Sequence, residues 1–354
     1  MFNEKLVSER LTLRDFDEVQ ETFLARAWSD GLPIIPPTET KVREMIAASG
    51  LPATEVIGVV PPRFAEASVE LVAVNAVMAG CRPAYMPVVL AALRAACDPA
   101  FRLYSIQATT HPCGVLAVVS GPITRTLGMN AGFGTFGPGN HANATIGRAY
   151  GLLSQNLQGG SEPGMTYLGS QGNGYMYNSL TFAENEDRSP WAPFHVQHGF
   201  QPGDSVVSIF GGVRSTAYCL GLRETYWRTH VRNMLRGLHP YLPPTLVLDP
   251  ITAQQFVDRG GFDTADKLIR WVHDNATMPA EVYWDYQLIQ NYVYPKALKG
   301  VEPYATMLRA PKDEPIPVYP IDSIHVVVVG GETNGYWRIM GCNYSKSVSI
   351  DEWR

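Results

Sequence analysis

A glycine-rich segment, Gly128 to Arg148, is the part of the sequence whose residue types point most directly to a binding site. Glycine leaves backbone N–H groups unobstructed by side chains, and the segment leads into a predicted helix over Ala144–Leu157. Free N–H groups at a helix start, together with the helix dipole, favour an anion. The expected substrate-binding residues here are Gly132, Gly134, Gly139, Asn140, His141, Asn143, Thr145 and Arg148.

The spacing of these glycines matches neither of the common nucleotide-binding fingerprints. It is not G-x-G-x-x-G directly after a strand, and it lacks the lysine of a Walker A loop. An ordered loop with glycine wherever φ must be positive is the structural alternative to a ligand cradle.

The turn around His111 lies between two apolar runs that we expect to be strands, Leu103–Thr109 and Val115–Ser120. Chemistry in open α/β sheets gathers at strand ends. Histidine exchanges protons near neutral pH, and cysteine becomes a nucleophile when its thiolate is stabilised. We therefore predict catalytic roles for His111 and Cys113. The alternative is a buried turn whose role is purely structural.

A second thiol, Cys81, lies in an elbow between two predicted helices, Ala67–Ala79 and Ala84–Cys97. The start of the following helix and the adjacent Arg82 would both lower a thiol pKa. Cys81 is therefore a candidate catalytic thiol, and Arg82 is a candidate clamp on the substrate. A small buried residue in a tight elbow is the alternative, because free cysteine is among the most buried residue types.

Two carboxylates are candidates for acid/base catalysis. Glu66 stands in an otherwise apolar setting, which indicates either a surface bend or a site facing inward. Glu184 opens the acidic string ENEDR, where a solvated loop is the default and a pocket is the alternative. His195 and His198 lie three residues apart, but without an HExxH helix they are a weak metal signal, and we assign no metal ligand.

The surrounding elements indicate an α/β or α+β protein, with a mixed sheet and helices packed on it. Apolar strand-like runs alternate with helical patterns, and the clearest buried strand is Ser323–Val329. Two strand-then-glycine units, Val115–Gly121 and His325–Gly331, leave room for two intimate pseudo-repeated halves. We expect a helical arm and loop over residues 1–50, followed by one large core over 51–354 that is divisible near 200–245.

Composition excludes several classes of protein. At 354 residues and 45% hydrophobic content the chain buries a sizeable core without disulfides or metals. A net charge of −5 and no lysine or arginine run argue against nucleic acid. No apolar run reaches membrane-spanning length, and the N-terminal residues lack the apolar stretch of a signal peptide, so we expect none. Five cysteines without a CxxC pair suggest reduced thiols, so we expect a cytoplasmic protein.

Several long strings resemble an uncharacterised bacterial family whose members occur beside, or fused to, a UGSC-type domain. The strings are WSDGLPIIPPT, AVNAVMAGCRPAYMPVVLAAL, ATTHPCG, FGPGNHANATIGRA, FAENEDRSPW and HVVVVGG, and they run from about Trp28 to Gly331. The resemblance implies thiol or selenol chemistry on small metabolites. This chain has no Cys-Gly-Ser-Cys tetrad. The resemblance therefore implies either that a separate UGSC-type partner supplies the motif or that this member works without it.

We therefore predict an enzyme that acts on a small anionic metabolite by thiol-assisted redox or carbon–heteroatom bond cleavage. The first alternative is an acid/base lyase, isomerase or hydrolase that uses Glu66, His111 and Glu184 without a thiol. The second is a non-catalytic subunit of a UGSC-type complex. The sequence identifies no cofactor. A homo-oligomer is expected in all three cases, because the aromatic cluster around Tyr283 to Tyr294 is typical of core or interface.

Overall fold

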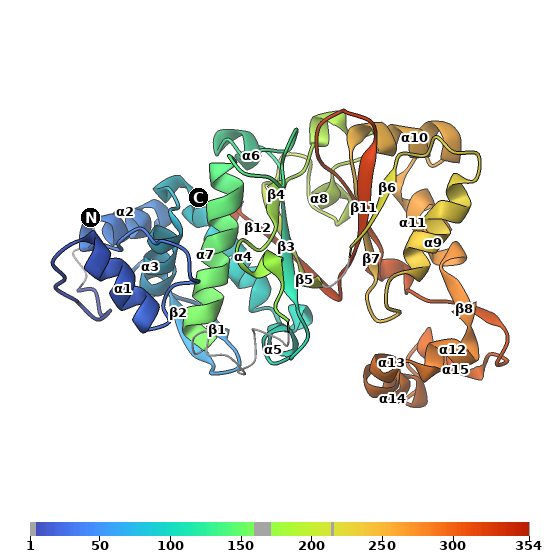
Figure 1. Ribbon diagram of the computed structural model, residues 1–354, viewed down its shortest axis with the longest axis horizontal. Helices are drawn as coiled ribbons and strands as arrows, with labels where there is room; N and C mark the ends of the chain where they lie inside the picture. The colour runs from blue at the N-terminus through green and yellow to red at the C-terminus, as the bar shows by residue number, and fades with distance from the viewer. Residues whose placement is uncertain (1–4, 159–170, 214–215, 354) are drawn as a thin grey trace. The chain divides into compact units, whose positions relative to one another are not determined.

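The computed structural model describes residues 5–158, 171–213 and 216–353. The chain forms two compact units, each built on a four-stranded mixed sheet with helices packed against it (Figure 1). This confirms the predicted α/β class. Unit 1 comprises residues 1–184, 195–213 and 344–354, and unit 2 comprises residues 185–194 and 214–343.

Unit 1 contains most of the helices that the sequence predicts for the first half of the chain. Its helices and 3-10 turns are α1 (Phe16–Ala25), α2 (Glu39–Ser49), α3 (Val69–Ala79), η1 (Pro83–Tyr85), α4 (Met86–Ala96), η2 (Pro99–Phe101), α5 (Leu103–Gln107), α6 (Ile123–Thr126), α7 (His141–Gln158), η3 (Gly174–Met176) and η6 (Asp351–Trp353). Its strands are β1 (Val56–Val60), β2 (Ala65–Ser68), β3 (Gly114–Ser120), β4 (Thr181–Ala183), β5 (Val206–Val213) and β12 (Tyr344–Ser349). A short helix, α8 (Phe194–Gln197), begins at the last residue of a unit 2 segment.

The sheet of unit 1 has the order β12-β5-β3-β4. Strand β3 is parallel to β4 and antiparallel to β5, and β12 is antiparallel to β5. All residues of β3 and β5 are buried, which is why both strands read as continuous apolar runs instead of alternating ones. The β1–β2 hairpin forms a separate two-stranded sheet.

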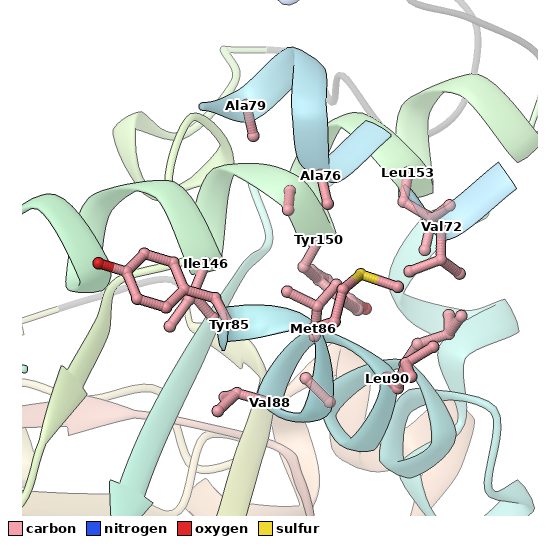
Figure 2. Close-up of a cluster of buried hydrophobic side chains, with 14 of the residues drawn as sticks. Val72, Ala76, Ala79, Tyr85, Met86, Val88, Leu90, Ile146, Tyr150 and Leu153 are labelled. Atoms are coloured by element: carbon pink, nitrogen blue, oxygen red, sulfur yellow. The ribbon is translucent and has the colours of Figure 1, made fainter. Parts of the chain in front are cut away.

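The core of unit 1 is a helical layer in which α3, α4 and α7 meet. Its side chains interdigitate in one hydrophobic cluster (Figure 2). Because α3 and α4 are apolar nearly all round, they sit inside this layer, as the sequence indicates. The labelled residues of the cluster are Val72, Ala76, Ala79, Tyr85, Met86, Val88, Leu90, Ile146, Tyr150 and Leu153.

Unit 2 carries its own hydrophobic cluster around a second sheet, of order β10-β7-β11-β6. Its strands are β6 (Thr216–Leu220), β7 (Pro244–Leu248), β8 (Thr277–Pro279), β9 (Pro315–Pro317), β10 (His325–Val328) and β11 (Tyr336–Gly341). Its helices and 3-10 turns are η4 (Glu186–Arg188), α9 (Trp227–Arg236), α10 (Pro250–Gly260), α11 (Ala265–Asn275), α12 (Ala280–Asp285), α13 (Gln287–Tyr292), α14 (Tyr294–Leu298), α15 (Tyr304–Arg309) and η5 (Ile321–Ser323).

The two four-stranded sheets share one pattern. In each, a parallel pair (β3 with β4, β7 with β10) lies beside an antiparallel strand (β5, β11) that pairs with a final edge strand (β12, β6). The edge strand of each sheet follows directly after a strand of the other sheet. Strand β5 leads into β6 of unit 2, and β11 leads into β12 of unit 1. The expected pseudo-repeat is thus present in sheet topology, although β10 corresponds to β4 and not to β3.

Two predicted elements are wrong. The run from Leu103, predicted as a strand, is the helical turn α5, whose buried residues Leu103, Ile106 and Gln107 have helical spacing. The sequence pattern over Tyr218–Leu235 also predicts one helix, but helix α9 begins only at Trp227, because the residues before Gly221 form β6. Short apolar runs do not distinguish a strand from a single helical turn.

Residues 5–50 contribute to the core of unit 1. Phe23, Ile34 and Val42 are buried in the same cluster as α3 and α4. The chain passes from unit 1 to unit 2 after Glu184 and again after Val213. Among the described residues, no helix has the length and hydropathy needed to cross a membrane.

Candidate active site

The carboxyl ends of the parallel strands β3 and β4 bring two polar side chains together in unit 1. Because Val119 pairs with Ala183, the next residues, Ser120 and Glu184, are neighbours. The Ser120 hydroxyl donates a hydrogen bond to Oε2 of Glu184 over 2.7 Å, and both side chains are at least 96% buried. A hydroxyl that donates a hydrogen bond to a buried carboxylate favours the charged form of that carboxylate.

His195 is the third member of this cluster. A ring nitrogen of His195 and a carboxylate oxygen of Glu184 lie within 4.8 Å of each other, and the imidazole is fully buried. The pair consists of a carboxylate and an imidazole, side-chain types that commonly act as acid or base in enzymes. We refer to Ser120, Glu184 and His195 as the β-edge triad.

Close packing at the end of β3 helps to fix the β-edge triad. Gly121 has a φ of +91°, and a Cβ at this position would lie 2.0 Å from the carbonyl oxygen of Asp204. Only glycine fits here, because both the conformation and the close approach exclude a side chain. The backbone that follows Ser120 is therefore held against the segment that leads into β5.

The glycine-rich loop follows β3 through α6 and packs beside β4. The ring of Phe136 contacts that of Phe182 edge to face, with centroids 4.9 Å apart, and Phe182 lies two residues before Glu184. Gly134 and Gly139 adopt positive φ and have open space around them, whereas Gly132 does not need positive φ. The loop therefore lies at the same sheet edge as the β-edge triad.

Three asparagine side chains hold the loop in shape. Asn143 accepts from the N–H of Asn130 and donates to its carbonyl, and Asn140 donates to the carbonyls of Gly134 and Gly137. Asn130 in turn donates to Asn140. The side-chain amides hydrogen-bond within the loop. Asn140 directly precedes α7, but its side chain therefore does not cap the helix.

The start of α7 is consequently open. Within the ranges that the structure describes, no hydrogen bond reaches the N–H groups of His141 and Ala142. His141 is exposed, and its Nδ1 lies 3.3 Å from the hydroxyl of the buried Tyr85. The first turn of α7 therefore offers unpaired donors and the positive end of an 18-residue helix dipole.

The Cys81 elbow packs against this same helix. The Cys81 thiol donates to the carbonyl of Thr145 over 3.2 Å, which places two predicted site residues in contact. Burial raises the pKa of the Cys81 thiol to about 12, against the lowering effects of that hydrogen bond and of Arg148. The thiol is therefore protonated at neutral pH, contrary to the expected effect of Arg82, which is exposed to solvent.

Arg148 is engaged inside the protein. It forms a two-pronged ion pair with Asp30, with both N···O distances 2.8 Å, and it donates to the carbonyls of Leu32 and Pro33. Its side chain is 16% exposed. This geometry favours a structural role, in which Arg148 fixes the Asp30 loop against α7, over the expected role as a clamp on substrate.

Three predicted catalytic residues lie elsewhere in unit 1. His111 and Cys113 precede β3, so they stand at its amino end, a strand length of about 20 Å from Ser120. The turn follows a helix and not a strand, which removes the argument for placing chemistry there. Glu66 is exposed on the β1–β2 hairpin, which Figure 1 shows at the end of α7 away from α6.

Sequence reasoning assigned no role to Ser120, Tyr85 or His195. Ser120 carries a signal in retrospect, as a polar residue that closes a fully apolar strand. His195 was noted only as half of a weak metal motif with His198. Nothing in the spacing of the chain shows that His195 meets Glu184, because the contact depends on how the segment between them folds back.

Comparison with known proteins adds no relative. No protein-family model matches this chain, and no curated protein is significantly similar to it. The resemblance to the family associated with UGSC-type domains stays a prediction.

Proposed function

We propose that this protein is an acid/base enzyme that acts on a small molecule with an anionic group. Glu184 and His195 are the proton-transfer groups in this proposal, and Ser120 is the positioning residue that orients the Glu184 carboxylate. The observation that carries the proposal is the burial of this carboxylate–imidazole pair at the carboxyl ends of parallel strands, where α/β proteins place their chemistry.

The glycine-rich loop and the open start of α7 supply the binding half of the proposal. Unpaired N–H groups at a helix start favour a carboxylate or phosphate, and the loop lies at the same edge as the β-edge triad. Because the triad is buried, we propose that the loop over residues 130–140 moves to admit the substrate.

The chemistry supported is proton transfer, as in a lyase, an isomerase or a hydrolase. The high pKa of Cys81 favours this class over the thiol-assisted reactions that the sequence also suggests. A thiolate is the reactive form of cysteine, and burial suppresses it here.

The test is proton exchange from deuterated water. Wild-type protein is incubated in D₂O with a panel of 2-oxo acids, 2-hydroxy acids and phosphate monoesters, and deuterium incorporation and turnover are followed by NMR. We expect exchange or turnover with at least one member, and a loss of about a hundredfold or more in Glu184→Gln and in His195→Gln. Glu66→Gln, a matched change at an exposed carboxylate, should retain the wild-type rate.

Equal rates in wild type and Glu184→Gln would refute the proposal. The circular dichroism spectrum and melting temperature of each variant separate loss of catalysis from loss of folding.

A non-catalytic role beside a UGSC-type partner is the second candidate, favoured by the string FGPGNHANATIGRA together with the lack of a Cys-Gly-Ser-Cys tetrad. It predicts that the chain alone turns over nothing in the panel and copurifies with a UGSC-type protein. Activity of the isolated chain would exclude it.

A further inference from the structure

Helix α9 of unit 2 presents arginines at regular spacing along one side. Its buried residues Trp227, Val231 and Leu235 recur every four positions and pack into the unit 2 core. An arginine follows each of them, at positions 228, 232 and 236. We refer to Arg228, Arg232 and Arg236 as the arginine row.

The arginine row has no acidic partner. In the described part of unit 2, none of the three guanidinium groups forms an ion pair, whereas Arg188 and Arg309 each pair with a glutamate. Arg228 and Arg236 are exposed, and Arg232 is half-buried. The row therefore concentrates positive charge on a protein whose net charge is −5, and such a surface attracts anionic partners.

Two of the arginines are already held in place by neutral groups. The Arg228 guanidinium lies 4.4 Å from the ring centre of Trp227. Arg232 donates to the side-chain oxygen of Asn275 and lies 5.9 Å from the ring centre of Trp271, both on α11, which runs beside α9 (Figure 1). Holding a guanidinium in place before binding lowers the entropy lost when an anion binds to it.

The spacing of the row fits an extended acidic segment. Four residues of helix rise about 6 Å, and alternate side chains on one face of an extended strand are about 6.7 Å apart. Tyr226, directly before the helix, is 74% exposed and adds an aromatic contact of the kind found at binding hot spots.

We propose that α9 binds an acidic segment of another polypeptide, with carboxylates at alternate positions of an extended strand. A short peptide is favoured over nucleic acid because the positive charge is confined to one helix, while the rest of the chain is net negative. This surface lies in unit 2 and is independent of the proposed chemistry in unit 1.

The test uses full-length protein and a short fluorescein-labelled peptide of alternating glutamate and serine, with binding followed by fluorescence anisotropy. The double variant Arg228→Gln/Arg236→Gln removes the two exposed charges and leaves Arg232, which packs on Trp271, in place. We expect about a tenfold or greater loss of affinity, and binding to wild type that weakens as salt is raised.

The control Lys299→Gln/Lys312→Gln removes the same net charge from exposed positions in the same unit and should bind like wild type. Equal affinity in the arginine variant and wild type would overturn the proposal, as would equal loss in both double variants. Tighter binding of a labelled single-stranded oligothymidine than of the peptide would identify a nucleic-acid surface, and no binding near 1 mM protein would exclude any such surface.

Discussion

At the scale of single residues, one group of buried polar side chains gathers at the carboxyl edge of β3 and β4. Ser120, Glu184 and His195 are each buried; Ser120 donates a hydrogen bond to Glu184, and a ring nitrogen of His195 lies within 4.8 Å of a Glu184 oxygen. Burying a polar group is costly unless it is hydrogen-bonded, so the Glu184 carboxylate depends on the Ser120 hydroxyl for its position. Burial likewise suppresses ionisation of the Cys81 thiol, whose pKa it raises.

Replacing Ser120 by alanine should lower the free energy of unfolding by about 1–3 kcal/mol, because it leaves a buried Glu184 oxygen without its donor. Urea denaturation measures this change. Ser105→Ala, at an exposed serine, should stay within about 0.5 kcal/mol of wild type. A Ser120→Ala protein as stable as wild type would show that the hydroxyl contributes little to the network.

Cys81 should resist alkylation in the native protein. With a pKa of about 12, roughly one thiol in 10⁵ is ionised at pH 7, far fewer than in an unfolded chain. Mass spectrometry of the Cys81 peptide after iodoacetamide treatment, with and without urea, measures the protection. Equal labelling in both conditions would contradict the raised pKa of the Cys81 thiol.

The same shift makes stability fall in alkali. Because the folded pKa lies above the ordinary value of 9.0, the contribution of the Cys81 thiol is fully present below about pH 9 and is lost as pH rises toward 12. Cys81→Ala should therefore lose less stability than wild type between these pH values.

At the scale of elements, α7 organises unit 1. Its first turn borders the glycine-rich loop, Arg148 holds the Asp30 loop, and Gln155 donates to the carbonyls of Ala27 and Ser29. Gly147 brings the helix so close to the segment before β4 that a Cβ would lie 1.8 Å from the carbonyl oxygen of Asn178. One helix thus connects the N-terminal residues, the loop and the sheet.

Gly147→Ala should destabilise unit 1 strongly, by several kcal/mol, because backbone and not a flexible side chain fills the space. Thermal unfolding followed by circular dichroism measures the effect. Gly174→Ala is the matched control, since nothing lies within 4 Å of its added Cβ and its φ is not positive. Similar melting temperatures for the two variants would contradict the close packing of α7.

At the scale of the whole molecule, each sheet is completed by a strand that arrives from the other unit's part of the chain. Strand β12 closes the edge of unit 1 beside β5, and the fully buried Ile350 after it lies in the unit 1 core. Unit 2 is closed in the same way by β6. The two units therefore have separate hydrophobic cores but are interdependent in chain connectivity.

A chain that ends at Asn343 should lose the fold of unit 1, because β5 becomes an unpaired apolar edge and Ile350 leaves the core. Hydrogen exchange should show loss of protection in β3 and β5, with the β7–β11 pairing retained. A synthetic peptide of residues 344–354 added in trans should restore protection, and a scrambled peptide should not. Full protection in the truncated chain would contradict this account of the sheet.

The sequence by itself determined the fold class, most helices and the buried strands, because apolar periodicity and glycine or proline stops act locally. It also indicated the glycine-rich loop, the start of α7 and the Cys81 elbow as candidate site segments. The Cys81 elbow and the start of α7 are in contact. It misassigned α5 and part of β6, where short apolar runs fit either element.

Only the tertiary structure decided which polar residues meet. His195 reaches Glu184 through the return of the chain, Arg148 turns inward to Asp30, and His111 falls at the wrong end of β3. It also decided the protonation of Cys81, since burial outweighs the charge that its sequence neighbour suggests. Such facts depend on contacts between residues far apart in the chain, and local pattern carries no information about them.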